Sequence, residues 1–199
     1  MRNVKISIIL IALIFSVLVN ADCNDDTSNE LYDDNCAFDT NVVGWVDAIT
    51  VGSMIHDSED FQNSVSSGSA LISSSSSMPA NAIMSRCLPM STPNLMNSGA
   101  WVKYNSGSEP NCRLLIGYYP DSSCAGAVIS QGAGVELLIN AAGGWTHLSG
   151  YSYGNDLNVN SVIFSMFCNS SDSFAMKADN FYVVPAPGLP VELQEFSID

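Results

Sequence analysis

The chain has few basic residues and few histidines. Its 199 residues include six lysines and arginines and two histidines, against twenty aspartates and glutamates. The formal net charge of −14 at pH 7 would repel nucleic acid and anionic membrane surfaces. The composition therefore excludes a nucleic-acid partner and favours solubility or cation binding.

The motifs that many enzymes need are also missing. His56 and His147 have no nucleophile motif beside them, and neither a Gly-x-Ser-x-Gly elbow nor a phosphate-binding glycine loop occurs. Jelly-roll glycosidases place paired carboxylates on one strand face. The nearest approach here is Asp57, Glu59 and Asp60, which fall at the end of a predicted strand. We expect no catalysis, and a small hydrolase is the remote alternative.

Only one long apolar run occurs, at residues 6–19, and it follows Arg2 and Lys5. A run of this length is short for a bilayer span and is typical of a secretory signal. Small Ala21 predicts cleavage after that residue, so residues 1–21 are interpreted as a signal peptide. No second apolar run follows, and we expect no membrane insertion after cleavage.

The exported chain is predicted to be secreted, with the periplasm or the cell surface as alternatives. A lipoprotein is the weaker interpretation, because Asp22 precedes Cys23 where a small residue is expected. Removal of the signal leaves four of the six basic residues against twenty acidic ones, a net charge of 4 − 20 = −16.

The rest of the chain divides into three predicted parts. Residues 22–34 carry six acids and few apolar positions, which predicts a solvated segment, since an EF-hand's ligand spacing and glycine are absent. Residues 35–185 form one predicted domain. Residues 186–199 begin as a proline-rich spacer and then alternate like a strand that could pair with the domain's edge or with a partner.

Strand patterns fill the predicted domain, and helical periodicity is absent. Serine-, glycine- and asparagine-rich turns separate the runs. Residues 114–116 and 162–167 are apolar on both faces, which predicts central strands. We expect an all-β, antiparallel two-sheet sandwich of eight or nine strands. The runs are 48–56, 69–73, 82–89, 99–104, 113–119, 135–140, 145–150, 159–168 and 174–184.

All six cysteines lie after the predicted signal, where disulfides can form. Cys112 and Cys124 flank a stretch that resembles a hairpin, so the sequence predicts that they pair. Cys87 and Cys168 both end strand-like runs and are predicted to join neighbouring strands, which leaves Cys23 with Cys36. A zinc site is the alternative, but no Cys-x-x-Cys spacing occurs.

Two segments about 140 residues apart each place an aromatic residue beside an acid: 35–40, followed by Gly44-Trp45, and 178–183. They stand at the two ends of the predicted domain. This arrangement predicts that the first and last strands meet and that Trp45 belongs to the core.

The order of several short motifs resembles galactose-binding-like jelly rolls, which include the carbohydrate-binding modules of bacterial xylanases and glucanases. The resemblance covers residue 35 to about residue 185. Its motifs are Asn-x-x-Phe-Asp-Thr, Gly-Trp, Gly-x-x-Leu from Gly68, Cys-Leu-Pro at Cys87, Ala-Trp-Val-Lys, Trp-Thr-His-Leu-Ser-Gly and Asp-Asn-Phe-Tyr-Val.

The resemblance implies a structural calcium ion that ties the first strand to the last. The matching residues are Asp39 and Asp179. Calcium takes six to eight oxygens, so backbone carbonyls or waters would have to complete the shell. The alternative is that Asp39 caps a turn and Asp179 is merely exposed. Where family members often carry Glu, Asp39 is shorter, which would weaken its contact.

A sugar site needs exposed aromatic rings with polar partners beside them. Trp101 and Lys103 share one side of a predicted strand, and lysine usually faces water, which favours an exposed Trp101. The predicted binding residues are Trp101, Lys103, Tyr118, Tyr119, Tyr151 and Tyr153. Further candidates are Trp145, His147, Asn155 and Asp156. Packing in the core or in loops is the alternative for each.

Non-catalytic binding of a polysaccharide or other glycan is the function that the sequence favours. The main alternative is a structural or adhesive protein of the cell surface or extracellular matrix that uses the same sandwich without binding sugar. The two differ in whether the aromatic residues share one exposed face.

Overall fold

A computed structural model describes residues 31, 36–47, 52–63, 67–75, 80–89, 95–153 and 159–185. Within these residues the chain forms strands and no helix, so it contains no helix that could cross a membrane. The strands are β1 (Val46–Asp47), β2 (Gly52–Asp57), β3 (Ser69–Ser74), β4 (Ala80–Pro89), β5 (Leu95–Gly107), β6 (Asn111–Tyr119), β7 (Ser130–Ala133), β8 (Leu137–Leu138), β9 (Thr146–Tyr153), β10 (Ser161–Ser170) and β11 (Phe174–Pro185).

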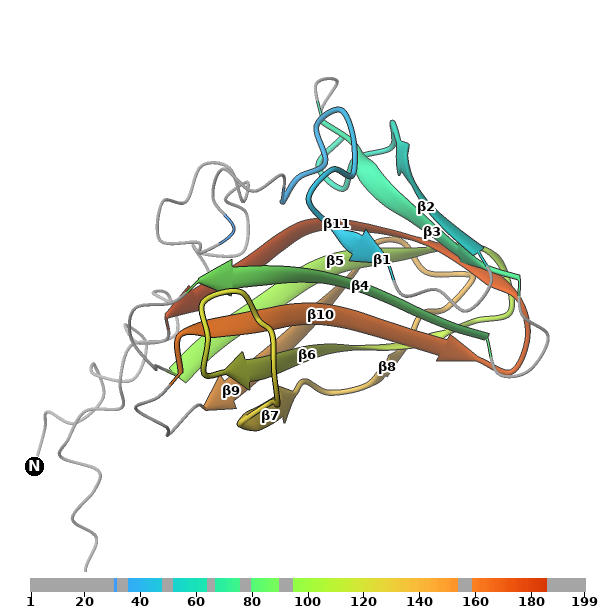
Figure 1. Ribbon diagram of the computed structural model, residues 1–199. Helices are drawn as coiled ribbons and strands as arrows, with labels where there is room; N and C mark the ends of the chain where they lie inside the picture. The colour runs from blue at the N-terminus through green and yellow to red at the C-terminus, as the bar shows by residue number, and fades with distance from the viewer. Residues whose placement is uncertain are drawn as a thin grey trace, which may run out of the picture.

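The strands build two antiparallel sheets that form a sandwich (Figure 1). The first sheet has the order β1-β4-β10-β6-β7, with β8 also pairing with β6. The second sheet has the order β2-β3-β11-β5-β9. The all-β sandwich predicted from the sequence is confirmed.

Each of the nine predicted runs overlaps a strand of the structure. The central position predicted for residues 162–167 is also confirmed, because β10 lies between β4 and β6. The sequence did not indicate β1 and β7. The first has two residues and the second is the short, glycine-containing Ser130–Ala133, so neither carries an apolar alternation that could be recognised.

The core between the sheets is centred on four aromatic side chains. Trp45 is 6% exposed, as predicted for a core residue, and its ring lies 4.7 Å from that of Phe181. Phe38 and Phe164 meet the Phe181 ring edge-on at 5.7 and 5.8 Å. Tilted and edge-on packing suits the quadrupoles of aromatic rings, and each buried ring adds roughly 1.5–3 kcal/mol of transfer free energy.

The two end segments meet, but not as paired strands: residues 36–45 form no strand, and β1 belongs to the first sheet whereas β11 belongs to the second. Phe38 of the first segment contacts Phe181 of the last strand, and the backbone N–H of Phe181 donates to the carbonyl oxygen of Cys36 at 3.1 Å. The beginning and the end of the domain are therefore fastened by one aromatic cluster and a backbone hydrogen bond.

Both disulfide pairs predicted among the last four cysteines are wrong. The structure joins Cys87 to Cys124 and Cys112 to Cys168, with Cα–Cα distances of 6.0 and 4.1 Å. Cys36 is also disulfide-bonded. The Cys23 predicted as its partner lies outside the described residues.

The strand register gives the physical reason for this correction. Residues 113–119 form one extended strand and no hairpin, so β6 carries the chain roughly 20 Å away from Cys112 before the turn to Cys124 begins. Cys87 faces Ile163 in β10, five residues from Cys168, which is also too far for a disulfide. Cys168 instead faces Cys112 directly. The loop after β6 crosses β10 and brings Cys124 to Cys87 (Figure 1).

Candidate functional site

The outer face of the second sheet, which points away from the first sheet, carries the candidate site. On β5 the side chains of Ala100 and Val102 are fully buried in the core, whereas Trp101 and Lys103 are half-buried on the opposite face. This is the alternation of a strand with one face in the core. It places Trp101 and Lys103 on one face, as their spacing predicted.

A bulge in β11 brings Tyr182 to this face. The register between β11 and β5 shifts between Asp179 and Tyr182, and Asn180 takes a left-handed backbone with φ of 49°. The extra residue reverses the alternation of side chains along the strand. Phe181 consequently enters the core, while Asp179 and Tyr182 both reach the outer face.

Five rings make a continuous row on the outer face, which we call the aromatic row: Phe61, Trp101, Trp145, His147 and Tyr182. Trp101 lies 5.0 Å from His147, which in turn stacks on Tyr182 at 5.9 Å. Phe61 also stacks on Trp101 at 4.4 Å and meets Trp145 edge-on at 6.4 Å. The members come from β5, β9, β11 and the connections beside them.

One glycine makes room for the end of the row. A Cβ atom at Gly99 would lie 2.2 Å from the ring of Tyr182. The absence of a side chain therefore lets this ring lie flat across β5. The hydroxyl of Tyr182 then reaches to within 3.2 Å of Nε2 of His147 on β9, within hydrogen-bonding distance. Burial lowers the pKa of His147, which favours the neutral imidazole.

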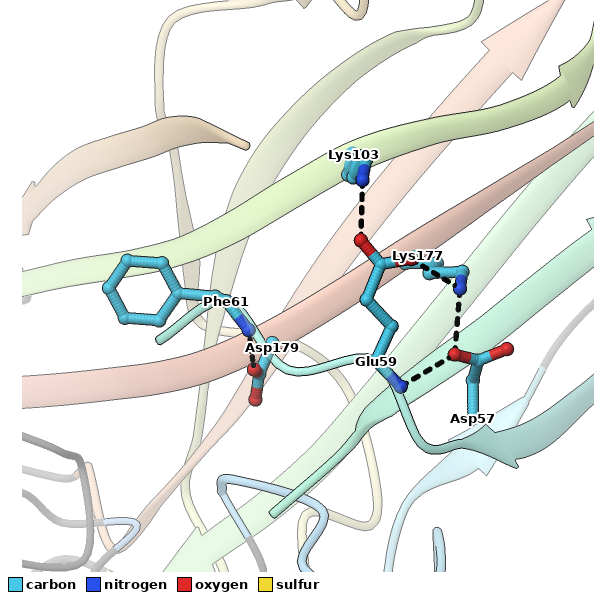
Figure 2. Close-up of polar contacts among 6 residues, drawn as sticks. All are labelled: Asp57, Glu59, Phe61, Lys103, Lys177 and Asp179. Carbon is cyan, nitrogen blue, oxygen red and sulfur yellow. Dashed lines mark hydrogen bonds and ion pairs between the residues drawn. The ribbon is translucent and has the colours of Figure 1, made fainter. Parts of the chain in front are cut away.

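An ion cluster of Asp57, Glu59, Lys103 and Lys177 lies beside the row (Figure 2). Nζ of Lys177 donates to Oδ1 of Asp57 at 2.7 Å and to Oε2 of Glu59 at 2.8 Å, and Lys103 donates to Oε1 of Glu59. Two carboxylates thus balance two ammonium groups. Lys177 is only 8% exposed, so its charge depends on these partners.

The cluster lowers the pKa values of its two carboxylates and raises the pKa of Lys177. Hydrogen bonds from Lys103 and then Lys177 lower the pKa of Glu59. Burial alone would raise the pKa of Asp57, but the hydrogen bonds from Lys177 and the Glu59 amide, together with the Lys177 charge, outweigh burial and lower it. Burial would lower the pKa of Lys177, and its bonds to Asp57 and Glu59 raise it instead. Asp57, Glu59 and Lys177 remain charged at neutral pH.

Residues 58–63, which we call the strap, connect the ion cluster to the aromatic row. The strap leaves β2 and passes over β11 (Figure 2). Glu59 enters the ion cluster, and the backbone N–H of Phe61 donates to Oδ2 of Asp179 at 3.0 Å. The Phe61 ring then lies on Trp101 at an interplanar angle of 13°. These contacts hold the strap against the sheet.

The predicted binding residues divide among several places. Tyr118 is fully buried in the core, so the prediction that it contacts a ligand is wrong. It lies on the inward face of β6 together with Leu114 and Ile116. The sequence did not indicate this direction, because both faces of the strand carry apolar residues. Tyr119 is half-buried in the first sheet, away from Trp101.

The other two predicted tyrosines belong to β9. The backbones of Tyr151 and Tyr153 pair with those of Asn97 and Leu95 of β5, which continues the strand that carries His147. Their side chains lie outside the described part of the structure, as do Asn155 and Asp156. A role for these residues in binding stays a prediction.

Sequence reasoning missed Phe61, Tyr182 and Lys177 as parts of this face. The one available signal was parity: Lys177 and Asp179 alternate with the apolar Met176 and Ala178 as a half-buried strand requires. Nothing local indicated that the strap would lie over the sheet. The acids Asp57 and Glu59 stood out only as an incomplete glycosidase pattern, and the structure pairs both with lysine.

The sequence predicted a calcium site at Asp39 and Asp179. Among the described residues, no group of three or more His, Cys, Asp or Glu side chains lies close enough together to hold a metal ion. Asp179 is 1% exposed, and its two oxygens accept the N–H groups of Phe61 and Asn180. Asp39 is exposed. An ion at these two residues would need most of its oxygens from backbone carbonyls or water, and calcium there stays a prediction.

No protein-family model matches the sequence, and no curated protein matches it significantly. Comparison with solved structures finds 90 similar chains. The enzymatically active domain of tailspike protein 4 of bacteriophage CBA120 has a TM-score of 0.59 at 12% identity, covering 79% of this chain. This chain spans only 21% of the length of that tailspike chain.

Two similar structures are carbohydrate-binding modules of nearly the same extent. The CBM22-1 xylan-binding domain of Paenibacillus barcinonensis Xyn10C has a TM-score of 0.57 at 13% identity, covering 77% of this chain and 93% of that one. TmCBM61, solved in complex with β-1,4-galactotriose, has a TM-score of 0.53 at 12% identity, covering 79% and 99%. The chain thus has the jelly-roll fold of carbohydrate-binding modules, as its motifs predicted.

Proposed function

We propose that the protein is an exported, non-catalytic glycan-binding module whose ligand lies on the outer face of the second sheet. The observation that carries the proposal is the aromatic row. Trp101, His147 and Tyr182 stand on three neighbouring strands and contact one another in sequence. Rings aligned in this way can pack against the C–H faces of successive sugar units.

Polar groups beside the row supply partners for sugar hydroxyls. The hydroxyl of Tyr182, the imidazole of His147 and the partly exposed ammonium of Lys103 all lie on or next to it. A few polar groups within a largely apolar surface are the usual composition of a small-ligand site. The disulfides and the carbohydrate-binding neighbours are compatible with an extracellular location.

Catalysis finds less support on this face. Asp57 and Glu59 are a pair of carboxylates beside the row, and both are bound to Lys177. Their pKa values are lowered, whereas a general acid needs a raised one. The proposal therefore assigns this pair to holding the strap.

A structural or adhesive role is the second candidate, and one observation favours it. The Trp101 ring is already covered on one side by Phe61 of the same chain. A surface row that only packs against itself would need no ligand. The two functions differ in whether any polysaccharide is bound.

Affinity electrophoresis of the protein in gels containing xylan, mixed-linked β-glucan or β-1,4-galactan tests the proposal. We expect retardation by at least one polysaccharide. We also expect that Trp101→Ala or His147→Ala weakens it at least about tenfold, which corresponds to about 1.4 kcal/mol. Tyr119→Ala, in the first sheet, is the matched control and should bind like the wild type.

Circular dichroism establishes that each variant is folded before its retardation is compared. Absence of retardation by every polysaccharide, extended to a glycan array, would leave the structural role as the better explanation. Equal losses in Trp101→Ala and Tyr119→Ala would place the ligand elsewhere on the molecule.

A further inference from the structure

We infer that the strap is a built-in competitor for the glycan site, in which Phe61 occupies the ring face of Trp101 that a sugar would use. This inference rests on the proposed function and adds a closed state to it. The stack is nearly parallel, with ring centres 4.4 Å apart and planes at 13°. A pyranose ring binds an indole in the same way, with its apolar face flat on the ring.

The His147 ring does not block Trp101 in this manner. His147 is tilted by 41° to the indole at 5.0 Å and belongs to the adjacent strand of the same sheet. Its position is therefore fixed by β9. Phe61 belongs to a connection, so its position depends on the contacts that the strap makes.

Several contacts join the strap to residues on the strands. They include Glu59 with its two lysines, the Phe61 amide with Asp179, and the ring stack itself. Asp60 of the strap is also buried, at 5% exposure. Asp57, Lys103, Lys177 and Asp179 all lie on strands, so none of them must move when the strap lifts. Lifting it would uncover Trp101 and leave Lys177 paired with Asp57.

When the strap is closed, Trp101 cannot bind. The apparent affinity is therefore the affinity of the open form multiplied by the fraction of molecules in which Trp101 is open. Replacing Phe61 with alanine removes the competitor and leaves the other strap contacts in place. An aromatic stack contributes about 0.5–1.5 kcal/mol, which converts to roughly a two- to tenfold gain in affinity. Gln62→Ala, with an exposed side chain in the same strap, is the matched control and should show no gain.

The closing experiment measures the affinity of the full chain for xylohexaose and β-1,4-galactotriose by calorimetry. It compares wild type, Phe61→Ala, Gln62→Ala, Trp101→Ala and the double variant Phe61→Ala/Trp101→Ala. A gain in Phe61→Ala that vanishes in the Trp101→Ala background supports the inference. A gain that persists without Trp101, or an unchanged or reduced affinity in Phe61→Ala, overturns it while the proposed function stands.

A second measurement decides the inference without a ligand. In a Trp145→Phe background, acrylamide quenching reports on Trp101, because Trp45 is only 6% exposed. Quenching should increase in Phe61→Ala and stay unchanged in Gln62→Ala. If neither oligosaccharide binds any variant, the proposed site fails for these ligands. The quenching measurement still decides whether Phe61 covers Trp101. Unchanged quenching in Phe61→Ala overturns the inference.

Discussion

At the scale of single residues, the site depends on a glycine as much as on its aromatic side chains. Gly99 carries no Cβ, and the ring of Tyr182 uses that space to cross β5. The same crossing brings its hydroxyl to His147. A glycine inside a strand often marks such a close approach, but which side chain approaches is decided by a residue 83 positions further along the chain.

Gly99→Ala should therefore push Tyr182 out of the row. We expect the pKa of His147 to rise toward its ordinary value of 6.5, because the imidazole becomes better solvated. We also expect the free energy of unfolding to fall by about 1–3 kcal/mol from the forced contact. NMR titration of the imidazole and urea unfolding measure the two effects.

Gly144→Ala is the control for this change, since a Cβ there would meet nothing within 4 Å. It should leave both quantities near their wild-type values. If Gly99→Ala also left the His147 pKa and the stability unchanged, the packing of Tyr182 across β5 would be incorrect.

At the scale of elements, the bulge in β11 determines which residues reach the site. A regular strand would send Phe181 to the same face as Lys177 and Asp179, outside the core. With Asn180 in the left-handed region, Phe181 instead joins the core cluster and Tyr182 joins the aromatic row. The bulge thus serves the fold and the site at once.

Asn180→Ala and Asn180→Gly separate the backbone requirement from the side chain. Both variants lose the side-chain amide of Asn180, but only alanine has a Cβ atom that disfavours a φ of 49°. We expect the alanine variant to be less stable than the glycine variant by about 1–2 kcal/mol in chemical denaturation. Equal stabilities, or a less stable glycine variant, would contradict a left-handed residue at this position.

At the scale of the whole molecule, the ion cluster couples the first half of the chain to the last strand. Asp57 and Lys177 are separated by 120 residues and meet at 2.7 Å. The lowered pKa values of Asp57 and Glu59 mean that their stabilising effect is present above pH 4.5 and is lost as pH falls through the folded values. The raised pKa of Lys177 means that its effect is present below pH 10.5 and is lost at higher pH.

Lys177→Met tests this coupling through its dependence on pH. At pH 7 the variant should be less stable than wild type, because Asp57 loses its partner and Glu59 keeps only Lys103. The difference should shrink as pH falls below about 4, because the carboxylates of the unfolded chain then bind protons that the folded wild type takes up only at lower pH. Urea unfolding between pH 3 and 8 follows the difference.

Glu136→Gln provides the comparison beside the first sheet, because Glu136 pairs with Arg113 of β6 at 3.5 Å and both side chains are partly exposed. Its effect should stay within about 0.5 kcal/mol at every pH. A Lys177→Met difference that was constant from pH 3 to 8 would show that the loss comes from packing and not from charge.

The calcium hypothesis is also tested on the whole molecule. If calcium joins Asp39 and Asp179, thermal unfolding should shift to lower temperature after treatment with EGTA and recover when calcium is restored, because an ion that binds only the folded state stabilises it. Asp39→Asn should remove the shift. An unchanged melting temperature after chelation would refute an occupied site.

The sequence by itself determined the architecture. Its strand-length apolar runs and turns predicted nine strand positions, the place of β10 in the middle of a sheet, and the core position of Trp45. These properties are local, because the alternation of apolar and polar residues over five to ten positions already indicates which strands have a face in the core. The order of the short end motifs also predicted that the first and last segments meet.

Only the tertiary structure decided the disulfide pairs, the direction of Tyr182 and the position of the strap. Each depends on register or contact between distant segments: Cys112 faces Cys168 through the pairing of β6 with β10, and Phe61 finds Trp101 by crossing β11. A shift of one residue in register, or one bulge, sends a side chain to the other face without changing the local pattern. The candidate site is made from such contacts, and for that reason its residues could not be identified before the sheets were assembled.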